Sequence, residues 1–255
     1  MRNTLLIAGN VIKDAARRKL FYVVFLFGLA VLGLSPLLPT FDLGVRAQFL
    51  RDISISLTSL FGVVMAVVLS VNLIPGEVDR RTIYNILSKP VSRAQYLVGK
   101  YLGILGALAI ILSVMALEIL ILIGARLRLF TPVVLEGVLA VFLEAAVIAA
   151  FSLGLSTFAS APINVFATAL FYLLCHVKTG FLHQKLMEGA GGLARVFLWA
   201  LYYLLPNLED FNVSQQVGYG SGVTLSYALR IAGYSILFSA IFVFIGYLVF
   251  KRRDL

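Results

Sequence analysis

Six long apolar runs limit what this chain can fold into. A helix rises about 1.5 Å per residue and the hydrocarbon core of a bilayer is about 30 Å thick, so roughly 20 apolar residues make one crossing. Hydrophobic residues make up 61% of the chain and charged residues only 13%, unlike the balance in soluble domains. We therefore predict an all-α integral membrane protein with six transmembrane helices. The predicted crossings are residues 20–38, 54–74, 96–124, 133–158, 162–177 and 229–250.

The distribution of Lys and Arg predicts the orientation of these crossings. An even number of crossings places both termini on one side, and cytoplasmic loops carry an excess of Lys and Arg. Thirteen of the 21 basic residues lie at the two termini and between the second and third crossings, and eight lie on the opposite side. We expect a multi-pass protein of the plasma or inner membrane, with both termini cytoplasmic and residues 178–228 external.

Two further segments are expected at the membrane surface. Residues 1–19 have the pattern of an amphipathic helix, with Leu5 and Ile12 on its apolar face, and would lie along the inner leaflet. Within the external segment, residues 193–206 are apolar but too short to cross. We predict a short re-entrant or interfacial element there, because Trp199 suits the headgroup region.

A polar island, residues 76–100, separates the second and third crossings. Residues 77–88 have the pattern of a short amphipathic helix, which Pro90 would end. Ser92 and Gln95 form a capping-box pattern that predicts the start of the next helix. A helix held rigidly against the inner membrane face could transmit force from a cytoplasmic partner. A solvated connector that only carries positive charge is an equally good explanation from the pattern alone.

The island also carries a family motif. Its stretch EVDRRTIYNILSKPVSRAQYLVGKYLG resembles the pattern E-x-x-x-x-T-x-x-x-L-x-x-P-V-S-R-x-x-Y-L-x-G-K of type-2 ABC-transporter permeases, the membrane subunits of ATP-driven exporters. The matching positions are Glu77, Thr82, Leu87, Pro90, Val91, Ser92, Arg93, Tyr96, Leu97, Gly99 and Lys100. The expected topology and the C-terminal FKRRDL extend the resemblance over nearly the whole chain. One departure is Arg81, where the family commonly has Gly, and it bears on which ATPase is accepted.

The resemblance implies a coupling helix and several partners. In the family, this segment docks in a groove of the ATPase, so residues 76–90 are expected to form the cytoplasmic coupling helix and residues 1–19 the elbow helix beside it. Residues 1–255 would form a single permease domain that pairs with a second permease subunit, identical or related, and with two cytoplasmic ABC ATPase subunits. Membrane lipids would surround it, and nucleic acid is not an expected partner. The expected ATPase-coupling residues are Glu77, Asp79, Arg80, Arg81, Thr82, Leu87, Pro90 and Arg93.

The chain lacks the motif with which a permease could bind nucleotide itself. A P-loop needs G-x-x-x-x-G-K-[ST], in which backbone N–H groups hold the phosphates and a hydroxyl holds magnesium. Here Gly99-Lys100 is followed by Tyr101, and position 94 is Ala. We therefore expect a transporter subunit with no catalytic residue and no cofactor of its own, and ATP and magnesium in the partner ATPase.

Two other chemistries compete with this interpretation. Ser156 and His176 could be the nucleophile and base of an intramembrane protease, but the predicted topology places them near opposite membrane faces, whereas such groups must approach within about 3 Å. Cys175, His176 and His183 could form a soft-metal site, but they are scattered, and a buried thiol is the better explanation for the single cysteine. We expect no metal site.

Two acidic residues lie well inside predicted crossings, away from their ends. Glu118 falls towards the outer part of the third crossing and Glu144 near the middle of the fourth. A charge at mid-bilayer costs about 2.5–3.5 kcal/mol on insertion scales, so both side chains should face the protein interior. Each could line the substrate path or make a structural hydrogen bond between helices.

Small residues predict where helices approach closely. Gly99-x-x-x-Gly103 in the third crossing and Ala146, Ala150 and Gly154 in the fourth have the four-residue spacing of close helix contacts. Packing within one subunit explains them, although a dimer contact is an alternative.

We therefore predict the permease subunit of an ATP-driven exporter, with a lipid-like, amphipathic or other unidentified substrate. The alternative is a permease-like scaffold that relays ATPase motion to an external or maturation assembly, for which the 51-residue external segment is large enough.

Overall fold

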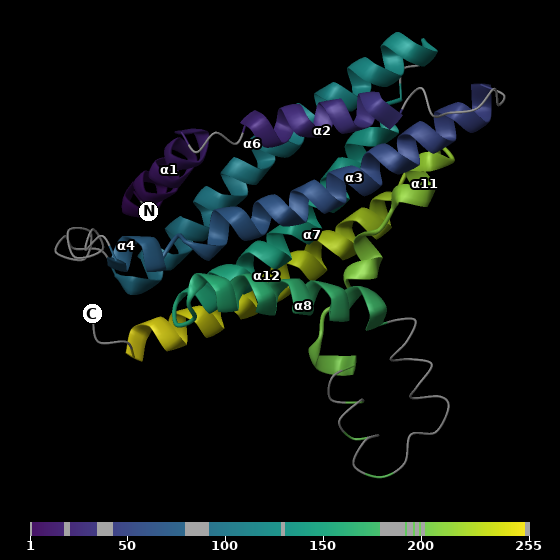
Figure 1. Cartoon of the computed structure of the whole chain (residues 1–255). Helices are drawn as coiled ribbons and strands as arrows, with labels where there is room; N and C mark the ends of the chain where they lie inside the picture. Colours follow the sequence, from purple (N-terminus) through teal and green to yellow (C-terminus); the bar gives the residue numbers. More distant parts are fainter. Residues whose placement is uncertain are drawn as a thin grey trace.

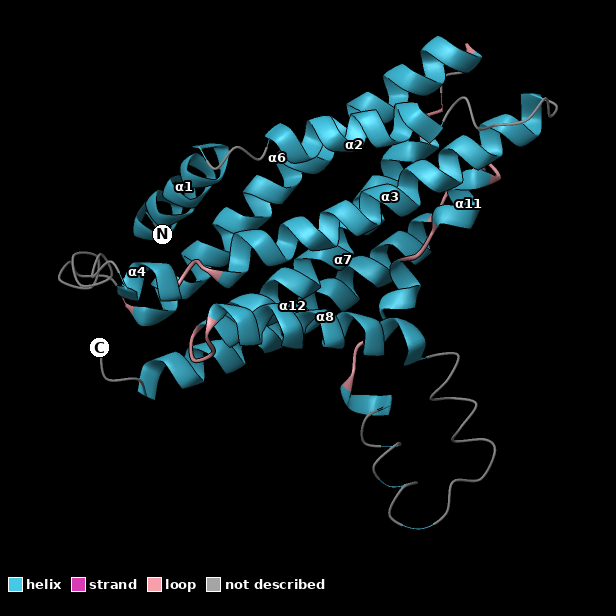
Figure 2. Ribbon diagram, viewed as in Figure 1, coloured by secondary structure: helices cyan, strands magenta, loops and turns pink. Residues whose placement is uncertain are grey.

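The computed structural model describes residues 2–17, 21–34, 43–79, 92–128, 131–178 and 202–252, with the single positions 192, 196 and 199. Helices joined by short loops make up these ranges, which contain no strand (Figure 2). The elements are α1 (Arg2–Arg17), α2 (Phe21–Leu34), α3 (Leu43–Val71), α4 (Pro75–Asp79), α6 (Arg93–Leu127), α7 (Val133–Ser156), α8 (Ala161–Val177), η3 (Leu208–Phe211), α11 (Ser214–Gly218) and α12 (Leu225–Arg252). The predicted all-α class is confirmed.

Each of the six predicted crossings falls on a helix, but the helices differ in length. Four are long and apolar enough to cross a membrane: Gly44–Asp79, which combines α3 and α4, Arg93–Ala125, Val133–Ser156 and Leu225–Arg252. The described parts of α2 and α8 have 14 and 17 residues, so that crossing by these two remains a prediction.

The second crossing was predicted to start at residue 54, but its helix begins at Leu43. Polar residues such as Arg51 interrupt the apolar run here, so the hydropathy pattern did not predict this extension. The structure accommodates Arg51 because its Nε donates to the backbone oxygen of Gly218, 3.1 Å away. A polar side chain therefore lies within a continuous helix at this point.

The N-terminal helix α1 packs along the first half of α6. Its buried face consists of Ile7, Ala8, Val11 and Ala15, whereas Leu5, expected on the apolar face, is 67% exposed. The approach is close because α6 presents glycines: a Cβ at Gly99 would lie 2.9 Å from the backbone oxygen of Thr4. Gly99-x-x-x-Gly103 therefore makes a close helix contact within the chain, with α1 as the partner.

The central helix of the bundle is α7, which packs against α3, α6, α8 and α12. Most of its residues are buried. Its predicted small-residue contact is made with α12, where a Cβ at Gly246 would lie only 2.8 Å from the Cα of Gly154. The two backbones can meet here because neither residue has a side chain.

The start of α1, the helix α4 and the end of α12 lie at one end of the bundle (Figure 1). The helix α11 lies at the other end, against the start of α3, where the Cβ of Asp52 approaches Gly218. Both described ends of the chain thus lie on the side of α4, as an even number of crossings requires.

Candidate functional site

One acidic side chain of the predicted coupling segment contacts two side chains at the start of α6. Glu77, in α4, accepts a 2.5 Å hydrogen bond from the hydroxyl of Tyr96 at Oε2 and forms an ion pair with Lys100 Nζ at Oε1. Tyr96 is fully buried and Lys100 is only 4% exposed. Because the partners are four residues apart on one helix face, α6 presents both to the same carboxylate.

The capping box predicted from the sequence fixes where α6 begins. Ser92 Oγ accepts from the backbone N–H of Gln95, and the Ser92 N–H donates to Gln95 Oε1, both at 3.2 Å. These two hydrogen bonds close the first turn of α6. They thereby fix the positions of Arg93, Tyr96 and Lys100 along the helix.

Arg93 joins this end of α6 to the end of α12. Its Nη1 donates to the backbone oxygens of Phe250 and Lys251, at 2.7 and 3.1 Å. These carbonyls are in the last turn of a helix, where a cation is favourable. Tyr96 also stacks on the Phe250 ring, with centroids 5.7 Å apart. We call Glu77, Arg93, Tyr96, Lys100 and Phe250 the inner cluster.

The inner cluster changes the interpretation of two predicted coupling residues. Glu77 and Arg93 were expected to contact the ATPase, and the structure places both against helices of their own chain. Asp79 is exposed at the end of α4. The predicted helix over 76–90 is described only within Pro75–Asp79, and five of the predicted contacts lie outside the described residues: Arg80, Arg81, Thr82, Leu87 and Pro90.

The second polar site surrounds Glu144, in the middle of α7. Its side chain is buried, with Ser59 of α3 donating to Oε2 at 2.9 Å. Nε2 of His176, from α8, lies 3.4 Å from Oε1. No hydrogen bond to Oε1 is formed by any described residue. Three helices therefore meet at a carboxylate, and one of its two oxygens accepts no hydrogen bond from the described residues.

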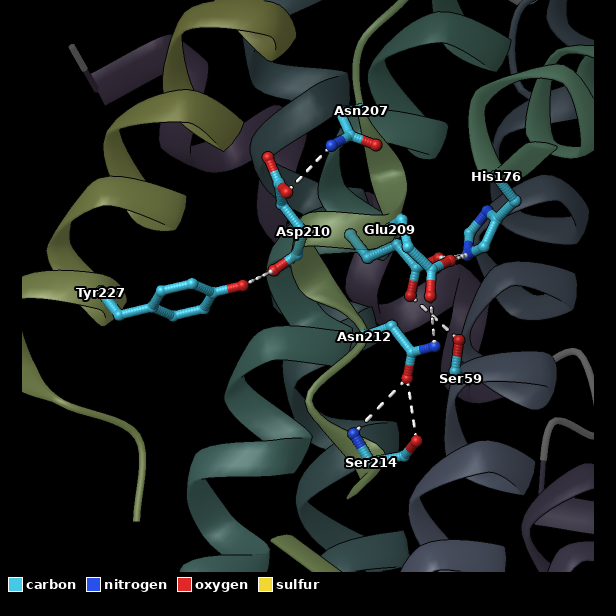
Figure 3. A network of polar contacts seen from close by, with 9 residues as sticks. Ser59, His176, Asn207, Glu209, Asp210, Asn212, Ser214 and Tyr227 are labelled. Carbon is cyan, nitrogen blue, oxygen red and sulfur yellow. Dashed lines mark hydrogen bonds and ion pairs between the residues drawn. The ribbon is translucent and has the colours of Figure 1, made fainter. Parts of the chain in front are cut away.

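A second acid approaches the same imidazole from η3. Glu209 Oε2 lies 4.0 Å from His176 Nε2, and Asn212 Nδ2 holds the other Glu209 oxygen at 2.8 Å. Ser214 Oγ in turn donates to Asn212 Oδ1 at 2.9 Å. Figure 3 shows Glu209 pointing toward His176, with Asn212 and Ser214 below it in this view. Sequence reasoning missed His176 and Glu209 as neighbours of Glu144.

A cavity of about 200 Å³ adjoins Glu144. Its walls come from α3, α7 and α8, and residues 211–214, which belong to the segment predicted to be external, form its other side, which we call the roof. After the roof, the chain is joined to the bundle by two hydrogen bonds: Arg51 donates to the Gly218 carbonyl of α11, and Glu136 Oε2 accepts from the N–H of Val223, which precedes α12, at 2.5 Å. The lining residues are Ile55, Ser56, Ser59, Val141, Glu144, Tyr172, His176, Phe211, Asn212, Val213 and Ser214.

Glu118 lies in a different environment from Glu144. A Cβ at Gly28 of α2 would be 3.3 Å from both Glu118 carboxylate oxygens, so α2 approaches this acid through a glycine. Glu118 is absent from the lining of the Glu144 cavity. The two acids predicted to lie on a substrate path are therefore not brought together.

An apolar groove is lined by residues of α6, α7 and α12. It has a volume of about 770 Å³, and its sparse polar groups include the hydroxyls of Tyr101, Ser235 and Ser239. This size is typical of a pocket for a small amphiphile.

The alternative chemistries find little support in this arrangement. Ser156 donates to the backbone oxygen of Leu153 at 2.7 Å, and it lies 12 residues beyond Glu144, or about 18 Å along α7. Since His176 is beside Glu144, the nucleophile and base of a protease do not meet. Cys175 is a buried free thiol, and His183 lies outside the described residues. Among the described residues, no group of three His, Cys, Asp or Glu side chains is suited to a metal ion.

Comparison with known proteins identifies the family. The model of the family described as ABC-2 family transporter protein matches residues 34–255, which include both polar sites. A comparison with curated proteins found none that matches. The family match covers well over half of the chain and agrees with its apolar helices. The chain therefore belongs to the ABC-2 family of transporter proteins, whose members are membrane permeases of ABC transporters.

Proposed function

We propose that the chain is the permease of an ATP-driven exporter that works as one of two permease subunits with two cytoplasmic ATPase subunits. Family membership implies an ATP-binding partner. The observation that carries the proposal further is the inner cluster, because it joins α4 to α6 through Glu77 and α6 to α12 through Arg93. Force applied to residues 76–90 would therefore reach two long helices directly.

In the proposed cycle, ATP binding closes the partner ATPases, which displace residues 76–90 at the cytoplasmic surface. The inner cluster transmits this displacement to the start of α6 and the end of α12. Paired permease subunits then change the side on which the substrate path is open, by rigid-body and hinge movements of helices. The residues proposed to contact the ATPase are those at and beyond the exposed end of α4, from Asp79 through Pro90.

The proposed substrate is lipid-like or amphipathic. The apolar groove of about 770 Å³ offers room for its hydrocarbon part. The polar cavity beside Glu144 offers a separate environment for a headgroup. Glu144 is accordingly the candidate for the substrate path. Glu118, which lies against Gly28 of α2 and lines neither space, is proposed to make a structural contact between helices.

The test is co-purification of the tagged chain with the ATPase encoded nearest to it, in wild type and in the variant Asp79→Ala with Arg80→Ala. Glu77 is left intact because it has partners within the chain. The control is Arg230→Ala, which removes an exposed charge about 33 Å from the other end of α12. We expect loss of the ATPase only from the double variant. Absence of any ATPase with the wild type would refute the proposal.

A second measurement addresses the scaffold alternative. The chain is reconstituted with its ATPase, and hydrolysis is measured with lipids and synthetic amphiphiles added one at a time. An exporter should show stimulation by at least one amphiphile. Hydrolysis that responds to an external protein and to no amphiphile would favour the scaffold.

A further inference from the structure

The groups around the Glu144 cavity are unbalanced in charge. Glu144 and Glu209 both face His176, at 3.4 and 4.0 Å from its Nε2. Even a protonated imidazole could neutralise only one of the two carboxylates. The Glu209 side chain is 43% exposed and is solvated, whereas Glu144 is buried, and a buried charge without a partner is costly. A positive group entering the cavity would therefore stabilise the carboxylate form of Glu144.

The open position is at Oε1 of Glu144. Ser59 occupies Oε2, whereas Oε1 is buried and accepts no hydrogen bond from any described residue. Glu144 as a whole is 2% exposed and lines the cavity. A donor entering the cavity would find a buried acceptor that His176 Nε2 approaches to 3.4 Å without forming a hydrogen bond.

The size and walls of the cavity suit a small organic group. One water needs only about 10–15 Å³ of such space, and the cavity has about 200 Å³. Tyr172 and Phe211 contribute aromatic surface to the lining, and aromatic rings attract organic cations. The hydroxyls of Ser56 and Ser214 and the amide of Asn212 add polar surface.

We propose that this cavity binds the primary ammonium group of the exported molecule, with Glu144 Oε1 accepting a hydrogen bond from the ammonium N–H. The proposal rests on the export function proposed above and narrows its substrate class to amphiphiles with an amine headgroup. A metal ion is a poorer occupant, because no three described side chains of the ligating types are arranged to hold one. An ammonium needs hydrogen-bond acceptors and no fixed coordination geometry.

The roof gives this site a direction. Residues 211–214 belong to the segment predicted to be external, and they separate the cavity from that side. Release of the headgroup to the exterior therefore requires the roof to move away from α3 and α7. Asn212 connects this movement to binding, since it lines the cavity and also holds Glu209.

The test is equilibrium binding of ethanolammonium to the purified full chain in a maltoside detergent, followed by ligand-observed saturation-transfer NMR. Ethylene glycol, which is neutral and of similar size, is the matched probe. Ligands this small bind weakly, so we expect a dissociation constant in roughly the millimolar range. Glu144→Gln, which keeps the shape and removes the charge, should weaken binding about tenfold or more.

Glu118→Gln is the matched control, because it also removes a carboxyl group from a predicted crossing and lies outside the cavity lining. It should bind ethanolammonium as the wild type does. Equal binding by Glu144→Gln and wild type would overturn the proposal, as would the lack of a saturable signal in the wild type. If Glu144→Gln does not purify as a monodisperse protein, the wild-type comparison decides, and equal binding of ethylene glycol and ethanolammonium overturns the proposal.

This experiment contains no ATPase, so its result is independent of the co-purification. Saturable, Glu144-dependent binding in a chain that recruits no ATPase would refute the ATP-driven function alone. Recruitment of the ATPase by a chain that does not bind ethanolammonium would refute the ammonium site alone.

Discussion

Removing the Glu77 carboxylate should destabilise the chain, because the buried Lys100 ammonium loses its ion-pair partner. Lys100 is 4% exposed and has Glu77 as its ion-pair partner. Removing one partner of a buried ion pair lowers the free energy of unfolding by about 3–5 kcal/mol. Because the Glu77 side chain is 24% exposed, we expect Glu77→Ala to lie at the lower end, with a loss of about 3 kcal/mol. The loss of the acceptor for Tyr96 is part of this figure.

Replacing the lysine as well should reverse most of the damage. In the variant Glu77→Ala with Lys100→Met, no charge is left uncompensated, and apolar replacements of buried pairs are often neutral, so we expect stability within about 1 kcal/mol of wild type. The two single variants and the double variant form a cycle with a coupling energy of about 2 kcal/mol or more. The assay is unfolding of the purified chain in mixed micelles as the fraction of dodecyl sulfate rises, followed by circular dichroism.

The same variants separate an internal role of Glu77 from a direct ATPase contact. If Glu77 only holds α4 against α6, the double variant should recover ATPase co-purification together with stability. Recovery of stability without recovery of the ATPase would show that the carboxylate itself contacts the partner. Additive effects, with coupling below about 0.5 kcal/mol, would refute the buried-pair reasoning altogether.

Three further predictions concern close contacts. Gly103→Val in α6 should lower the free energy of unfolding by about 1–3 kcal/mol, because the new side chain pushes α1 away. The same unfolding assay measures this loss, and Gly124→Val is the control, since a Cβ there meets nothing within 4 Å. Equal losses of stability in the two variants would contradict the prediction. Gly246→Leu should separate α12 from α7 and lower the unfolding midpoint, whereas Gly233→Leu, in open space on the same helix, should not; similar midpoints would refute this contact. Arg51→Gln should speed amide exchange in α11 about tenfold, from the loss of one hydrogen bond to a charged group, and unchanged exchange would show that α11 does not depend on it.

The apolar pattern was sufficient to predict the helices, and local motifs were sufficient to predict some of their ends. The capping box of Ser92 and Gln95 placed the start of α6 because its two hydrogen bonds join residues three apart. The start of α3 was wrong by about ten residues, because its first turns carry polar side chains, one of which, Arg51, donates a hydrogen bond to α11, far along the chain. Hydropathy cannot register such a partner.

The candidate sites show the same limit more strongly. The sequence predicted that Glu144 would face the interior, since an acid in a crossing has nowhere else to be stable, and this is confirmed by its burial. It did not predict His176 or Glu209, which are 32 and 65 residues away and meet Glu144 only through the packing of α8 and η3. Likewise, the resemblance implied an ATPase contact for Glu77 and did not predict its pairing with Lys100, which depends on how α4 lies against α6.

The length of α6 has a mechanical consequence. Its 35 residues make a rod about 52 Å long, which extends well beyond a hydrocarbon core of about 30 Å. The inner cluster contacts α6 at one end. A tilt of α6 by about 5° about this end would therefore move its opposite end by about 4–5 Å. A displacement too small to break the contacts of Glu77 would thus be amplified across the membrane, with α6 acting as a lever.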